Sequence, residues 1–126
     1  MKIKIAIWGT KQNYSIYADD TTNEFTFGLE KKTDGVQTFV RQAIDIVKAW
    51  PDRVEDNKIV DGVKYKIAYE DETGARQLVG ANATPETFST LMYLIHKHEP
   101  HNEKFLLQEE MQKKMIADQL SALNQR

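Results

Sequence analysis

Hydrophobic and polar positions alternate near the amino terminus, where the isoleucines are Ile3, Ile5 and Ile7. A period of two places these three side chains on one face of a β-strand. Residues 14–18 are rich in β-branched and aromatic side chains, and residues 25–29 alternate again. Each stretch predicts a strand, and the turn-forming residues between them predict a three-stranded meander.

The period then changes to that of a helix. Apolar residues three and four positions apart run along one stripe: Val36, Phe39, Val40, Ala43, Ile44 and Val47. This spacing predicts an amphipathic helix over residues 36–47. Thr33 or Asp34 is expected to cap its start, and Pro51 to prevent its continuation. Residues 52–58 are expected to form a charged loop.

A hairpin is predicted next. Asp61-Gly62 separates the β-type runs 59–60 and 63–69, and this dipeptide suits the positive φ angles of a tight hairpin turn. Residues 76–79 predict one more short strand.

Two further helices are expected in the remainder of the chain. Thr84 is expected to cap the first, with Pro85 at its first helical position and Pro100 after its end. Asn102 is expected to cap a helix that runs toward the carboxyl terminus.

The whole pattern predicts an α+β fold: an antiparallel sheet of five or six strands, with helices on one face and a third, carboxyl-terminal helix. Each half reads as β-hairpin, glycine, threonine and helix, with Gly28 and Thr33 matching Gly80 and Thr84. Duplication and coincidence explain this similarity equally well. We expect one domain over residues 1–101, followed by a helix over 102–126 that either docks on it or binds a partner.

The expected carboxyl-terminal helix carries two apolar stripes that do not align. Its apolar residues, the candidate partner-binding set, are Leu107, Met111, Met115, Ile116, Leu120 and Leu123. At about 100° per residue the first three lie on one slanted face and the last three roughly opposite. The surplus stripe is explained either by a kinked or loose end, or by contact with another protein or with a second copy of this chain.

Composition excludes several classes of protein. The 126 residues contain no cysteine, which excludes a disulfide scaffold, a thiolate metal site and a cysteine nucleophile. The net charge of −2 argues against a general nucleic-acid binder. No apolar run is long enough to span a bilayer, and the alternating lysines and isoleucines at the amino terminus do not resemble a signal peptide. A cytoplasmic location without membrane contact is expected.

The three histidines are weak candidate metal ligands. His96, His98 and His101 cluster in sequence but lack the i, i+4 spacing of helical zinc sites. A polar helix end explains them better. No nucleophile elbow or phosphate-binding loop occurs, so neither an enzyme nor a cofactor is expected.

Four lysines are expected on the opposite face from the isoleucines: Lys2, Lys4, Lys64 and Lys66. If their two strands are neighbours, they form a small basic patch on the open face of the sheet, either as solvated side chains or as a polyanion-binding site.

Two functions follow from these features. The first is a non-catalytic protein-interaction module, an adaptor or inhibitor of a larger protein, of a size found on mobile elements, that uses the carboxyl-terminal amphipathic helix. The alternative is a nucleic-acid or polyanion-binding domain that uses the lysine-bearing face.

Overall fold

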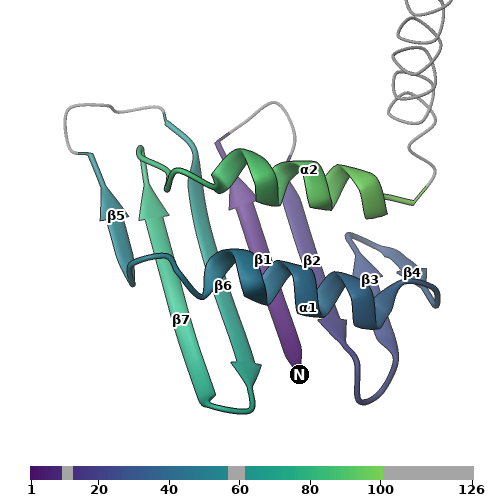
Figure 1. Ribbon diagram of the computed structural model, residues 1–126. Helices are drawn as coiled ribbons and strands as arrows, with labels where there is room; N and C mark the ends of the chain where they lie inside the picture. The colour runs from purple at the N-terminus through teal and green to yellow at the C-terminus, as the bar shows by residue number, and fades with distance from the viewer. Residues whose placement is uncertain (10–12, 57–61, 101–126) are drawn as a thin grey trace, which may run out of the picture.

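The computed structural model of this chain describes residues 1–9, 13–56 and 62–100. These residues form two layers, a seven-stranded sheet and two helices that both lie on one of its faces (Figure 1). No helix in this part of the chain is long and apolar enough to cross a bilayer.

The sheet has the strand order β4-β3-β2-β1-β6-β7-β5. Its strands are β1 (Lys2–Trp8), β2 (Tyr14–Asp19), β3 (Glu24–Phe27), β4 (Glu30–Lys32), β5 (Arg53–Glu55), β6 (Lys64–Asp71) and β7 (Gly74–Ala81). Neighbouring strands are antiparallel except β5, which pairs with β7 in parallel. The helices are α1 (Val36–Val47) and α2 (Phe88–His98).

The expectation of five or six strands is therefore wrong, because the described residues form a seven-stranded sheet, with two helices packed on it. The missed strands are β4 and β5, each of three residues at an edge of the sheet. Charged residues dominate both, which discourages edge-to-edge aggregation but leaves no alternating apolar pattern to detect. The predicted third helix, the 59–60 strand and Asp61 of the predicted turn lie outside the described residues.

The core fills the space between the helices and the sheet. The alternating isoleucines of β1 are at most 1 % exposed, and they face the buried stripe of α1. Phe25, Phe39 and Tyr65 are its largest fully buried side chains. Burying each such side chain contributes about 1.5–3 kcal/mol, so the alternation of the strands and the stripe of α1 together hold the two layers in place.

Both predicted helix starts need correction. Gly35, not Thr33 or Asp34, precedes α1, with a φ of 71° and no capping side chain. An added Cβ there would lie 3.2 Å from the His98 ring. The second helix begins at Phe88 rather than at Pro85, and the Oγ1 of Thr87 accepts a 2.6 Å hydrogen bond from Trp50 Nε1 instead of capping. Tertiary contacts thus displace local capping at both helices.

The two central hairpins are related by an approximate two-fold axis. In the β1–β2 hairpin Ile5 faces Ile16, and in β6–β7 Ile67 faces Leu78 at the same sequence separation. Ile5 also faces Ile67 across the antiparallel β1–β6 ladder, so the axis passes between these two residues. It relates Lys2-Ile3-Lys4-Ile5-Ala6 to Lys64-Tyr65-Lys66-Ile67-Ala68, which differ at one position.

Candidate binding surface on the open face of the sheet

The face of the sheet opposite the helices is uncovered by any described element (Figure 1). Along β1 the exposed positions are those between the buried isoleucines, and β6 alternates in the same way. The pleat therefore sends one set of side chains into the core and the other onto this open face.

All four predicted lysines lie together on the open face, since β1 and β6 are neighbours in the sheet. Lys4 pairs with Ala68, and Ala6 pairs with Lys66. The resulting square has lysines on one diagonal and alanines on the other, with the approximate two-fold axis passing through its centre.

Lys2 and Lys64, at the ends of the patch, differ from Lys4 and Lys66 at its centre. Lys2 Nζ lies 3.6 Å from the Glu70 carboxylate, with both side chains at least half exposed, so this ion pair adds little stability. Lys64 faces Trp8 in the ladder and is half-buried. Lys4 and Lys66 are exposed, and among the described residues neither has an ion-pair partner.

Carboxylates are absent from the middle of the described open face. The cross-strand registers define two central rows: Lys31, Thr26, Tyr17, Lys4, Ala68 and Gln77 in one, and Ser15, Ala6, Lys66, Val79 and Arg53 in the other. Neither row contains Asp or Glu. The acidic side chains stand in the flanking rows, so the potential is most positive around Lys4 and Lys66.

A shallow hollow of about 260 Å³ lies on this face beside Lys4. Ala68 and Ala75 line it together with Tyr17, whose hydroxyl donates to an Asp19 carboxylate oxygen 3.4 Å away. Partial burial and the nearby Asp19 raise the pKa of Tyr17, so its hydroxyl stays protonated at neutral pH. Small side chains at the centre of the face thus leave room for a partner to approach the sheet closely.

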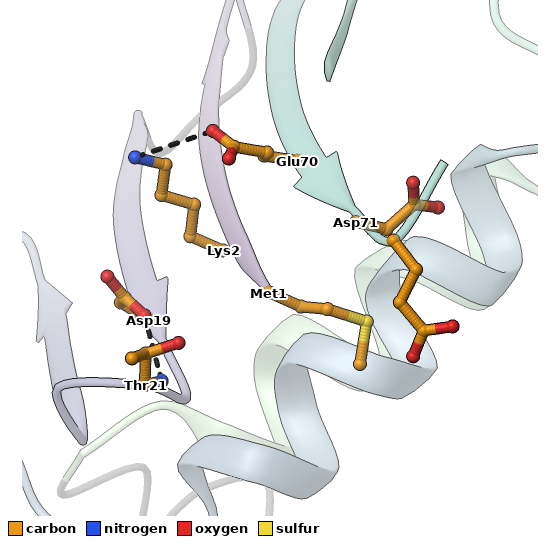
Figure 2. Close-up of a pocket in the computed structure, with 7 residues that line it drawn as sticks. Met1, Lys2, Asp19, Thr21, Glu70 and Asp71 are labelled. Carbon is orange, nitrogen blue, oxygen red and sulfur yellow. Dashed lines mark hydrogen bonds and ion pairs between the residues drawn. The ribbon is translucent and has the colours of Figure 1, made fainter. Parts of the chain in front are cut away.

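Several acidic residues line a neighbouring hollow of about 360 Å³ at one end of the sheet, which shares Lys2 and Glu70 with the first hollow (Figure 2). Burial opposes ionisation of Asp19, but backbone N–H donors of Thr21 and Thr22 outweigh it and lower its pKa. Asp71 accepts from the Thr73 hydroxyl at 2.6 Å and from its backbone N–H at 2.9 Å, which lowers the pKa of Asp71. These carboxylates are engaged in hairpin turns, the usual role of Asp at such positions.

The candidate metal ligands separate in space. His96 Nε2 lies 3.4 Å from the Tyr14 hydroxyl, while the His98 ring packs against Phe25 and Phe39. His101 falls outside the described residues. Within the described part of the chain, no group of three or more His, Cys, Asp or Glu side chains is placed to hold a metal ion.

The candidate partner-binding residues of the predicted carboxyl-terminal helix, Leu107 to Leu123, all lie outside the described residues. The alanines at the centre of the open face, Ala6 and Ala68, were not among the predicted site residues. The repeated motif Lys-x-Lys-Ile-Ala, at residues 2–6 and 64–68, contains the missing information, because it marks two equivalent strands with lysine and alanine on the same face.

The surface offers cations, small apolar side chains and two flanking aromatic residues. No family model, curated protein or solved structure matches the chain.

Proposed function

We propose that this protein is a non-catalytic protein-interaction module, an adaptor or an inhibitor, that binds an acidic surface of a larger protein through the open face of its sheet. The observation that carries the proposal is the pair Lys4 and Lys66, exposed, without ion-pair partners among the described residues and set beside alanines on an uncovered face. Charge complementarity of this kind guides association and selects among partners. The proposed location is the cytoplasm.

The proposal is tested by reversing the charge of the two central lysines. Immobilised wild-type protein is used to capture its partner from an extract of the source cells, and the partner's affinity is then measured for each variant. The Lys4→Glu/Lys66→Glu variant should bind at least about tenfold more weakly, a loss of about 1.4 kcal/mol. Lys97→Glu, an exposed change on α2, is the matched control and should bind like the wild type. Equal affinity of all three proteins would contradict the proposal.

The predicted carboxyl-terminal helix remains a second proposed contact with the partner. A 1–101 truncation should fold, because the described core contains no residue beyond Ile95. It should bind the partner more weakly than the full chain if residues 102–126 contribute a contact. A truncation that does not fold would show instead that this segment belongs to the core.

A second candidate function is binding of nucleic acid or another polyanion at the same face. The observation that favours it is the absence of carboxylates from the central rows, with Trp8 and Tyr17 available nearby for stacking. Binding to a single-stranded oligonucleotide should then weaken steeply as salt concentration rises. No detectable binding at low ionic strength would exclude this candidate.

A further inference from the structure

No described helix packs on the open face, although sheets of this kind often have a helix layer there. The two described helices both cover the opposite face (Figure 1). The register places Ala6 and Ala68 at the centre of the open face, where a helix would pack. We infer that the partner supplies this layer as an acidic α-helix, with two carboxylates one turn apart bound by Lys4 and Lys66. The inference rests on the proposed function and names the partner element that it requires.

The spacing of the lysines fits one helical turn. Lys4 and Lys66 are diagonal neighbours on adjacent antiparallel strands, a relationship that places backbone positions about 7–8 Å apart. Residues i and i+4 of a helix rise by about 6 Å and share one face. The flexible lysine stems take up the small difference, so each ammonium group can meet one carboxylate.

The surface between the lysines has the shape that a helix requires. Ala6 and Ala68 occupy the other diagonal, and Ala75 extends this low surface onto β7 through the hollow of about 260 Å³. Between the two lysines a helix would therefore meet only the methyl groups of these alanines. Burial of its apolar positions against alanine adds affinity to that of the two ion pairs.

The charges around the patch define where such a helix can lie. The described carboxylates of the open face stand outside the central rows, with Glu70 and Asp19 toward one end and Glu55 toward the other. They repel an acidic helix from the ends of the strands and leave the centre as the favourable position. The lysines themselves oppose pairing of this patch with the patch of a second copy, because two copies face to face would bring their lysines close together.

The approximate two-fold axis makes the two lysines equivalent anchors. It exchanges Lys4 with Lys66 and Ala6 with Ala68, so each lysine meets its carboxylate in the same backbone setting. The inference therefore predicts equal losses of affinity when either lysine is removed.

Two synthetic alanine-based helical peptides of identical composition provide the test. One carries its two glutamates at i and i+4, and the other carries them at i and i+2, on different faces of the helix. In NMR titrations of the full chain at low salt, the first peptide should shift the amide resonances of Lys4, Lys66 and Ala68. It should bind up to about fivefold more tightly than the second, because it forms two ion pairs at once and an exposed ion pair contributes at most about 1 kcal/mol.

The variants complete the test. Lys4→Ala and Lys66→Ala should each weaken binding of the first peptide by the same factor within about twofold, and Lys97→Ala should leave it unchanged. Equal affinities for the two peptides, no binding of either peptide, or dependence on only one lysine would overturn the inference. If partner capture still requires both lysines in that case, the proposed function stands and only the acidic helix is rejected.

Discussion

The ring of Tyr65 lies over Gly80, its partner on the neighbouring strand, so closely that a Cβ on Gly80 would be 2.0 Å from a ring carbon. Trp50 and Phe88 enclose the other sides of the ring, with centroids 5.4 and 6.0 Å away. The glycine thus provides the space in which the Tyr65 ring packs with Trp50 and Phe88, and the ring compensates for the missing side chain.

Replacing Gly80 with alanine should destabilise the fold. The added methyl group must displace the Tyr65 ring within a packed core, and such overpacking costs about 1–3 kcal/mol. Chemical denaturation monitored by tryptophan fluorescence measures the loss. In a Tyr65→Leu background the alanine should cost clearly less, and an undiminished cost would show that the ring is not the obstacle.

Replacing Tyr65 with phenylalanine should preserve or increase stability. The Tyr65 hydroxyl is buried and has no hydrogen-bond partner among the described residues. Removing an unsatisfied buried hydroxyl relieves its desolvation, with a gain of up to about 1 kcal/mol. A loss of more than that amount in the free energy of unfolding would contradict the absence of a hydrogen bond to this hydroxyl.

Arg76 should be a stabilising residue that lysine cannot replace. Its guanidinium donates to the carbonyl oxygens of Lys48 and Trp50, both at 2.9 Å, and to the Asp52 carboxylate at 2.5 Å. These bonds tie β7 to the end of α1 and to the segment before β5. Arg76→Lys keeps the charge but cannot make all three contacts, so it should cost about 1–3 kcal/mol.

A matched control for that variant is Arg53→Lys. Arg53 forms an exposed ion pair with Glu55 at 3.0 Å, and its replacement should change the free energy of unfolding by less than about 0.5 kcal/mol. Similar losses for both variants would mean that the carbonyl contacts of Arg76 contribute nothing.

Stability should fall in mildly acidic solution because of His98. Burial of the ring against Phe25 and Phe39 lowers its pKa below the usual 6.5, and the cations of Lys32 and Lys97 add to this against the opposing Asp34. The unfolded chain therefore binds a proton more readily than the folded one. The stabilising contribution is complete above pH 6.5 and is lost as the pH falls through the lowered pKa.

The His98→Gln variant should lack this decline in melting temperature between about pH 7 and 5. Changes caused by Asp19 and Asp71 occur at lower pH, because their pKa values lie below 3.8 in the folded protein. An unchanged pH profile in His98→Gln would assign the decline to another group.

Much of the central sheet and both described helices could be predicted from periodicity, because one face of each element is buried. The alternation at Ile3, Ile5 and Ile7 and the stripe of α1 are direct consequences of that burial. The edge strands β4 and β5 could not be predicted in this way. Their residues are mostly exposed, and their hydrogen bonds depend on neighbours that are distant in sequence.

The lysines of the open face could be assigned to one face of their strands, but not to one patch. That step required the pairing of β1 with β6, which joins segments about half the chain apart. The predicted starts of both helices were wrong for a related reason. The packing of His98 beside Gly35 and the hydrogen bond from Trp50 to Thr87 are tertiary interactions, which local sequence patterns do not reveal. The repeated Lys-x-Lys-Ile-Ala motif is the one local pattern that points to the pairing.

Site-specific photo-cross-linking shows directly whether the open face of the sheet binds the partner. A benzoylphenylalanine replaces either Gln77, exposed in a central row of the open face, or Lys97, exposed on α2. The partner should be cross-linked from position 77 and not from position 97. Cross-linking from position 97 alone would place the partner on the helical face and rule out binding through the open face.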